Sequence, residues 1–426
     1  MLIHLAYGKN GLDVDFNDAW HAQVVAPGYV PGLPDPSTAL SKALHNPIGS
    51  PALAGLVKPG DRVGIIVNDI TRATPNEVIL KAILQELAFV KRENITLFIA
   101  LGTHRADTAS ELESILGQEF AIGYRIVQNN AFDPDTQVFV GETSLGHPIR
   151  INRELMSCEV KILTGFIEPH FFAGYSGAGK AVMPGMAGIE TILGNHCASN
   201  IGHPNATWGH TWGNPIWEEV REVALKVKST FLVNVTLNRD KEITGVFAGE
   251  LDAAHAKGVE FARKTAMVPV AHLFDIVVTT NSGYPLDLNL YQTVKGMSAA
   301  AEVVRPGGAI LVASECWDGI PAHGLYGELL KQSSGPDELL KRILAPGFSK
   351  QDQWEAQIHA QILLKARVYL YTPNLTDEQM QAAHLIPSRD IHQTLEQLIQ
   401  EYGGNPRICV MPEGPQTIPY LSNQVI

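Results

Sequence analysis

Two histidines and a lysine lie in or just after one glycine-rich stretch, which reads EPHFFAGYSGAGK. His170 and Lys180 belong to this stretch, and His196 follows it. An imidazole exchanges protons near neutral pH, and a lysine among apolar neighbours can lose its proton and serve as a nucleophile or attachment point. Gly177 and Gly179 let the backbone approach a bound group closely. We therefore predict an active site that combines a base, an amine and a closely held ligand.

Two more polar clusters each follow an apolar run, and they read DITR and GTHR. The first contains Asp69 and Arg72, and the second contains His104 and Arg105. A guanidinium group matches carboxylate and phosphate, so both arginines are candidate anion binders. Asp69 either forms a structural ion pair with an arginine or holds a sugar hydroxyl. Two imidazoles can exchange protons on the two faces of one carbon, so we expect His104 to share a site with His170.

His196 is a candidate metal ligand, because imidazole suits nickel, copper, iron and zinc. Too few other ligand-type side chains lie near it in the sequence to complete a site made of protein alone. A metal bound here would need donor atoms from a cofactor. The alternative is a capping or surface histidine, since His196 directly follows the helix-ending pair Gly194 and Asn195.

A third group, which reads YQTVK, lies in the second half of the chain. Gln292 and Lys295 are three residues apart and share one face of a helix. From there Lys295 could reach across a cleft to a substrate carboxylate. The alternative is an ordinary solvated helix face.

The glycine-rich stretch also resembles the start of a phosphate-binding P-loop, because Gly174 and Gly179 precede Lys180 at the right spacing. A P-loop continues with serine or threonine to hold magnesium, whereas this chain has Ala181. A nucleotide triphosphatase therefore remains a weak alternative.

The composition is that of a globular protein. The 426 residues are 45% hydrophobic and 18% charged, with a formal net charge of −12, which argues against a general nucleic-acid binder. The sequence has no signal-peptide pattern and no apolar run long enough for a bilayer. The four cysteines form no CxxC pair, so we expect a reduced, cytoplasmic protein that binds neither membranes nor nucleic acid.

Short β-branched runs alternate with helical patterns and position these clusters. We expect an α/β fold of two domains with mostly parallel sheets flanked by helices. The expected strands cover 62–67, 95–101, 160–164, 231–236, 275–280, 309–313, 367–371 and 408–411. The expected helices cover 76–90, 108–116, 189–194, 215–227, 253–264, 293–304, 352–364 and 391–401. The polar clusters follow strands, where ligands bind in open α/β sheets, so we expect one active site.

We expect a domain boundary near residues 265–273, where a helical pattern leads into a new strand. We predict an N-terminal α/β domain over 1–270 that carries the cofactor site. A Rossmann-like α/β domain follows over 271–414, and a tail over 415–426 packs back on the first domain.

Taken together, these clusters resemble the nickel-dependent lactate racemase family over nearly the whole chain. The resemblance rests on DxTR at 69–72, GTHR at 102–105, PHxxAGYSGxxK at 169–180, His196, and YQxxK at 291–295. One departure is Ala178, where the family usually has the second glycine of a Gly-Gly pair, and alanine restricts φ.

The resemblance implies an active site in the cleft between the domains and a tethered nickel-pincer nucleotide, a pyridinium-3-thioamide-5-thiocarboxylic acid mononucleotide carrying nickel. It implies that Lys180 forms the covalent link and that His196 is the remaining nickel ligand. It also implies transient contact with the enzymes that make the cofactor. The residues implied to hold or border the nucleotide are Asp69, Thr71, Arg72, Ser176 and Gly177.

The implied reaction is the racemisation of a small 2-hydroxy acid by reversible hydride transfer from C2, with His104 and His170 as the acid and base. The residues implied to bind or border the substrate are Arg72, Tyr291, Gln292, Lys295 and Trp354. The runner-up hypothesis is a non-catalytic carrier of the cofactor, which would keep Lys180 and His196 but not need the two catalytic histidines.

Overall fold

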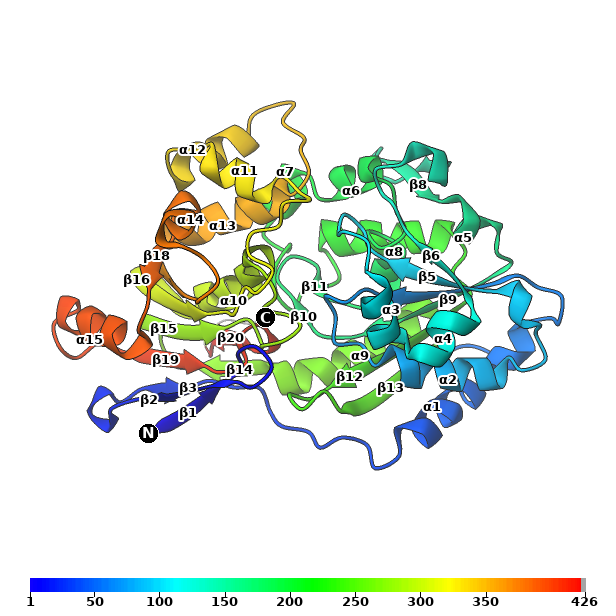
Figure 1. Ribbon diagram of the computed structural model, residues 1–426, viewed down its shortest axis with the longest axis horizontal. Coiled ribbons are helices and arrows are strands. Elements are labelled where there is room, and N and C mark those ends of the chain that lie inside the picture. Colours follow the sequence, from blue (N-terminus) through cyan, green and yellow to red (C-terminus); the bar gives the residue numbers. More distant parts are fainter. Residues whose placement is uncertain (423–426) are drawn as a thin grey trace.

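The computed structural model describes residues 1–422 and contains two lobes, each built on a six-stranded sheet with helices on its faces (Figure 1). The strands of the first sheet are β4 (Val63–Asn68), β5 (Ile95–Ala100), β6 (Arg125–Gln128), β9 (Val160–Phe166), β12 (Phe231–Leu237) and β13 (Ile243–Gly249). Their order is β13-β12-β9-β4-β5-β6, and every neighbour is parallel except the edge strand β13.

Helices cover both faces of the first sheet. One face packs against a cluster of buried side chains from α1 (Pro36–His45), α2 (Asn76–Glu86), α3 (Ala109–Leu116) and α4 (Gln118–Gly123). The other face packs against α8 (Pro215–Lys226) and α9 (Leu251–Ala266). All seven residues of β9 are buried, as expected for a central parallel strand that is covered on both sides.

The second sheet is parallel throughout and has the order β18-β17-β16-β15-β19-β3. Its strands are β3 (Gln23–Val24), β15 (Phe274–Thr280), β16 (Val304–Ala313), β17 (Ala366–Tyr371), β18 (Ile386–Ser388) and β19 (Ile408–Met411). One face is covered by α10 (Leu290–Val303) and α13 (Gln353–Lys365), and the other by α15 (Ile391–Glu401) and the hairpin of β1 (Leu2–Leu5) and β2 (Leu12–Asp15). The prediction of a mostly parallel α/β fold is confirmed.

The start of the chain crosses between the lobes, and its end pairs with the segment that joins them. The first strands lie with the second sheet, and the chain then runs to α1 in the other lobe, although the expected boundary assigned residues 1–270 to one domain (Figure 1). Near the other end, β20 (Ile418–Leu421) forms a parallel pair with β14 (Met267–Val270). The last residues of the predicted tail, 423–426, lie outside the described residues.

The remaining elements are short. They are α5 (Arg153–Ser157), α6 (Ile189–Asn195), α7 (Ala198–Ile201), α11 (Tyr326–Lys331), α12 (Pro336–Ile343), α14 (Asp377–Ala382), β7 (Gln137–Glu142), β8 (Pro148–Asn152), β10 (Pro169–His170), β11 (Gly174–Tyr175) and the 3-10 turns η1 (Asp18–Trp20), η2 (Leu53–Leu56), η3 (Arg92–Asn94), η4 (Pro134–Thr136), η5 (Ala178–Ala181) and η6 (Gly414–Gln416).

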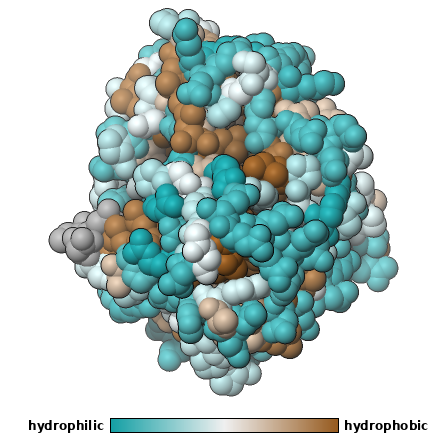
Figure 2. All heavy atoms as spheres, turned by 90° about the vertical axis from the view of Figure 1, so that its left-hand side faces the viewer, coloured by the Kyte–Doolittle hydropathy of each residue, from teal (hydrophilic) through white to brown (hydrophobic). Residues whose placement is uncertain are grey.

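The outer face of the second lobe is mostly hydrophilic, with apolar side chains gathered in patches among the polar ones (Figure 2). Over residues 1–422, no helix is both long and apolar enough to cross a bilayer.

Candidate active site

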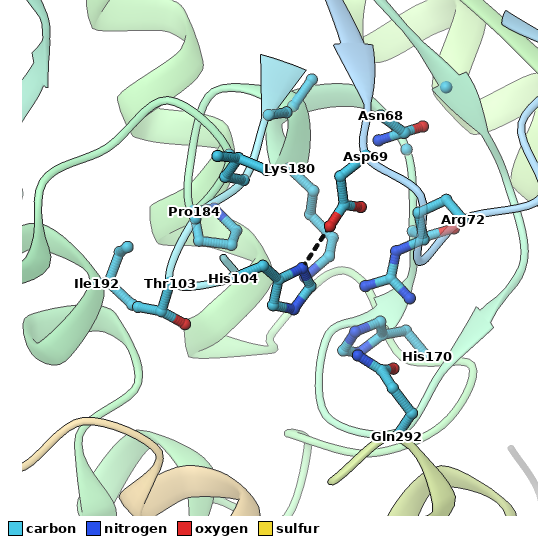
Figure 3. Close-up of a pocket in the computed structure, with 18 of the residues that line it drawn as sticks. Asn68, Asp69, Arg72, Thr103, His104, His170, Lys180, Pro184, Ile192 and Gln292 are labelled. Carbon is cyan, nitrogen blue, oxygen red and sulfur yellow. Dashed lines mark hydrogen bonds and ion pairs between the residues drawn. The ribbon is translucent and has the colours of Figure 1, made fainter. Parts of the chain in front are cut away.

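A cavity of about 110 Å³ lies where the loops after β4, β5 and β9 meet α10 and α13 of the second lobe. Every predicted site residue except Thr71 and Arg105 lines this cavity. These lining residues are Asp69, Arg72, His104, His170, Ser176, Gly177, Lys180, His196, Tyr291, Gln292, Lys295 and Trp354. Figure 3 shows that Arg72, His104, His170 and Gln292 point toward a common space. Residues far apart in the sequence therefore form one site between the lobes.

The His104 imidazole is held by a carboxylate. Its Nδ1 lies 2.7 Å from Oδ2 of Asp69, whose other oxygen accepts a hydrogen bond from the Thr71 hydroxyl at 2.8 Å (Figure 3). Burial works to raise the pKa of Asp69, but His104, Arg72 and the Thr71 hydroxyl together hold that pKa below its ordinary value. Asp69 is therefore ionised and orients His104, instead of forming an ion pair with Arg72.

His170 lies in a closed aromatic setting at the turn between β10 and β11. Its ring is 4.9 Å from the ring of Phe171 and 4.5 Å from that of Phe172, between centroids. The backbone N–H of Ala173 donates a hydrogen bond to its Nδ1 at 3.3 Å. Burial and the nearby charge of Lys180, followed by other cations, lower the pKa of His170 well below its ordinary value, so the ring is neutral.

Lys180 reaches the cavity from a strained loop. Ala178 has φ of 46° and Gly177 has φ of 88°, a region that side chains beyond glycine rarely adopt. A side chain at Gly177 would also lie 2.5 Å from Oδ1 of Asn234, which accepts the backbone N–H of Ala178 at 2.9 Å. Ala178 therefore adopts the glycine-like conformation in spite of its methyl group.

The Lys180 amine is surrounded by cations and apolar groups. Its Nζ lies 5.4 Å from the centroid of the Phe172 ring. Burial, Arg72 and Lys295 lower the pKa of Lys180 to about 7, against an opposing effect of Glu168. A substantial fraction of this amine is consequently neutral and nucleophilic at neutral pH.

His196 lies between two aromatic rings. Its centroid is 5.1 Å from that of Phe172 and 5.0 Å from that of Trp354, both in edge-to-face geometry. Its Nδ1 is buried and has no hydrogen-bond partner within the described chain. Burial and the charge of Lys180 lower the pKa of His196 well below its ordinary value. A neutral imidazole of this kind has the chemistry of a metal ligand.

The second lobe contributes polar groups to the opposite wall. The Lys295 amine donates to Oε1 of Gln292 at 2.7 Å, and the Trp354 indole donates to the Tyr291 hydroxyl at 2.7 Å. Across the cavity, Nη1 of Arg72 is buried without a hydrogen-bond partner among residues 1–422. An anionic ligand with a carboxylate would complete this arrangement, because an unsatisfied buried guanidinium donor is costly.

The cavity offers an amine that could attach an organic cofactor, but few side chains that could bind a metal ion directly. Within residues 1–422, no cluster of three or more His, Cys, Asp or Glu side chains could hold a metal ion. A metal at His196 would therefore need further ligands from an organic group, and the reactive amine of Lys180 is placed to anchor one. The donor set fits a tethered metallocofactor better than a bare ion.

Some site residues were not anticipated from the sequence, and one was misjudged. Glu355 lines the cavity beside Trp354, and burial raises its pKa in spite of nearby Lys295. The signal was the polar sequence of α13, which is almost wholly buried. Asn234 supports the lysine loop from a strand that reads as ordinary core. Arg105, expected to bind an anion, instead pairs with Glu111 through two hydrogen bonds of 2.8 and 2.7 Å.

Comparisons with known proteins identify relatives of this chain. A family model described as the lactate racemase N-terminal domain matches residues 7–209, and one described as the lactate racemase C-terminal domain matches residues 270–418. A lactate racemase from Thermoanaerobacterium thermosaccharolyticum is 34% identical over 422 residues, covering 98% of both chains. A lactate racemase from Lactiplantibacillus plantarum is 33% identical over 417 residues, covering 97% of this chain and 98% of the other.

Two solved structures are similar to this one. The lactate racemase apoprotein from Thermoanaerobacterium thermosaccharolyticum has a TM-score of 0.90 at 32% identity, covering 98% of this chain and 100% of that chain. A Thermotoga maritima protein has a TM-score of 0.72 at 18% identity, covering 92% of this chain and 100% of that one. The second likeness supports the fold alone.

Proposed function

The chain belongs to the lactate racemase family, and from this membership we propose that it interconverts the enantiomers of a small 2-hydroxy acid, with lactate as the first substrate to test. The protein is an isomerase. The observation that carries the proposal is the cavity itself, which combines two imidazoles, those of His104 and His170, with the unpartnered guanidinium donor of Arg72. A 2-hydroxy acid offers one hydroxyl for the histidines and one carboxylate for the cation.

The substrate carboxylate is assigned to Arg72, Gln292 and Lys295, where charge-assisted hydrogen bonds fix its orientation. Tyr291 and Trp354, which are joined by a hydrogen bond, border the substrate and limit its size. With the carboxylate fixed, the C2 hydroxyl can turn to either imidazole, and His104 and His170 serve as the acid and base.

We assign the cofactor as a nickel-pincer nucleotide held through Lys180 and His196. When bound, this group supplies the hydride acceptor that C2 chemistry requires. The neutral amine of Lys180 suits covalent attachment, and the unpartnered, neutral His196 suits a nickel ligand. The groups assigned to the nucleotide are Asp69, Thr71, Arg72, Ser176 and Gly177.

The test uses protein purified from a host that also contains the cofactor-making enzymes. Such protein should convert D-lactate or L-lactate into the racemate, as measured by chiral chromatography. His104→Ala should lower kcat by roughly 10²- to 10⁴-fold, the usual effect of losing an acid-base group. His4→Ala is the matched control, because His4 also lies 2.7 Å from a carboxylate but is exposed and remote.

Two further measurements separate the enzyme from a carrier. Lys180→Ala should remove the covalent mass adduct from the intact protein, and His196→Ala should lower bound nickel. Protein that carries the adduct and nickel but leaves each lactate enantiomer unchanged would instead be a carrier. Racemisation by protein made without the cofactor enzymes would contradict the cofactor assignment.

A further inference from the structure

Glu355 lines the cavity, but the functions assigned to its neighbours leave this carboxyl group without a role. It belongs to α13, directly follows Trp354 and is only 1% exposed. Within residues 1–422, its Oε1 is buried and has no hydrogen-bond partner. Lys295, the cation that acts on it most strongly, donates to Oε1 of Gln292 instead. Glu355 is therefore a buried polar group that the protein itself does not satisfy.

The surroundings of Glu355 favour its protonated form. A buried carboxylate is unfavourable unless donors or a paired cation stabilise it. Burial accordingly raises the pKa of Glu355, Lys295 and Arg72 oppose this effect, and Asp352 adds to it. The charged and titratable groups that face Glu355 are Lys295 and Tyr291 of α10, Tyr326 of α11, Asp352 beside α13 and Arg72 of the loop after β4.

A protonated carboxyl group carries an O–H donor, and a buried donor needs an acceptor. A ligand in the cavity can supply the acceptor that the protein does not. Arg72 and Lys295, the two cations that act on Glu355, are also the groups to which the substrate carboxylate is assigned. A carboxylate held by these cations lies on the same wall as Glu355 and is a strong acceptor.

We propose that Glu355 is a further substrate-binding residue, which donates a hydrogen bond from its protonated carboxyl group to the carboxylate of the 2-hydroxy acid. This role rests on the proposed racemase function and deepens it. The hydrogen bond is charge-assisted and adds to the contacts from Arg72, Gln292 and Lys295. Because the substrate carboxylate does not change during racemisation, this bond stabilises the ground state and the transition state alike and acts on KM more than on kcat.

The first test compares two replacements of similar size in the holoenzyme. Glu355→Gln keeps a hydrogen-bond donor, whereas Glu355→Leu has none. Glu355→Leu should raise the KM for lactate at least about tenfold, the usual effect of losing a charge-assisted hydrogen bond, with a smaller change in kcat. Glu355→Gln should keep a KM within about threefold of the wild-type value at pH 7. A KM that Glu355→Leu leaves unchanged would overturn the proposal.

Gln357→Leu is the matched control for packing of α13. Gln357 is fully buried on the same helix, and its Oε1 also lacks a partner within the described chain, but it does not line the cavity. Its replacement should change the free energy of unfolding without raising KM. A rise in KM as large as that of Glu355→Leu would mean that the effect comes from the helix, and the proposal would be wrong.

The pH dependence of KM separates a protonated donor from an ionised carboxylate. Binding favours protonated Glu355, so affinity should be lost as the pH rises through the raised pKa of this group. Lys295 must be charged to bind the substrate, and its deprotonation weakens binding in the same direction in both enzymes. Between pH 7 and 9, the wild-type KM should therefore rise more steeply than that of Glu355→Gln, by up to about tenfold per pH unit. Equal slopes would overturn the proposal.

A binding measurement separates this role from the proposed function. 2-Hydroxyisobutyrate has no hydrogen at C2, so it can bind to the holoenzyme without turnover. Calorimetry in two buffers at pH 9 gives the number of protons taken up on binding, which should be smaller for Glu355→Gln than for the wild type. Equal uptake would overturn the proposal. Binding that Glu355→Leu weakens, in a holoenzyme that does not racemise lactate, would support the role of Glu355 and contradict the proposed function.

Discussion

At the scale of single residues, Lys180 lies in a setting that is unfavourable for a charged amine. Burial and the neighbouring cations Arg72 and Lys295 act on Lys180, whose pKa falls to about 7. The charged amine is therefore unfavourable in the folded state, although it is fully solvated in the unfolded chain. The same environment makes the amine reactive, so stability is given up for chemistry at this position.

Lys180→Met should consequently stabilise the protein at neutral pH while abolishing the covalent adduct. Between pH 7 and 10.5 the unfolded lysine binds more protons than the folded one, so wild-type stability rises with pH across this window. The advantage of the methionine variant should be largest near pH 7 and below, on the order of 1–2 kcal/mol because the Lys180 side chain is not fully buried and its charge is partly screened, and should shrink toward pH 10. Urea unfolding at pH 6.5 and 9.5 measures this difference, and an advantage that grew with pH would contradict it.

At the scale of elements, the reactive loop depends on the sheet beneath it. Asn234 projects from β12, is fully buried, and accepts the backbone N–H of Ala178 at 2.9 Å. From α9, His255 lies with its Nε2 2.9 Å from the carbonyl oxygen of Ser176. These two contacts hold both ends of the strained turn that precedes Lys180.

Asn234→Ala should lower the free energy of unfolding by about 1–3 kcal/mol, because the N–H of Ala178 loses its partner while buried. The same change should loosen the turn and alter the rate at which an amine reagent labels Lys180, followed by peptide mass spectrometry. Asn152→Ala is the matched control, since Asn152 is a buried N-cap of α5 away from the cavity. The idea fails if both variants lose stability and leave the Lys180 labelling rate unchanged.

The elements also show what the sequence can predict. The eight expected strands lie within one or two residues of β4, β5, β9, β12, β15, β16, β17 and β19 for most of their bounds, because buried parallel strands are continuous apolar runs. The polar clusters could be assigned to one site because they follow these strands. The short edge strands β3, β18 and β20 were not anticipated, since two to four residues carry no periodic signal and form only when a partner strand is present.

Side-chain partners were harder to predict than positions. Asp69 has an arginine three residues away in the sequence, but it pairs with His104 on a different loop. In the sequence, Glu355 has the pattern of an ordinary helix residue, but in the structure α13 is mostly buried and Glu355 lines the cavity. Such contacts depend on tertiary packing, which one sequence does not encode in any local pattern.

At the scale of the whole molecule, the cavity exists only while the two lobes stay together. The first lobe supplies the histidines and Lys180, and the second supplies Gln292, Lys295 and Trp354. The chain also joins the lobes at its start, through β3 in the second sheet, and its end pairs through β20 with the connecting strand β14. Family membership could be predicted from the clusters and the fold from the alternating runs, whereas the crossing at the start of the chain could not.

One hydrogen bond joins the C-terminal segment of the chain to a residue close to the site. The Gln416 amide in η6 donates to Oε2 of Glu168 at 2.8 Å, and Glu168 is buried two residues before His170. Gln416→Ala should lower the free energy of unfolding by about 1–3 kcal/mol, because the buried carboxylate loses a charge-assisted hydrogen bond. Gln400→Ala, on the exposed face of α15, should have little effect.

Gln416→Glu sharpens the same test, because it keeps the shape of the side chain but places a second carboxylate against Glu168. Two like charges repel, so this variant should be less stable than Gln416→Ala at pH 8. Urea unfolding at pH 8 measures both variants against the unchanged chain. A deficit of Gln416→Glu no larger than that of Gln416→Ala would mean that Gln416 and Glu168 are not in contact in solution, and that the tail does not link the lobes at this point.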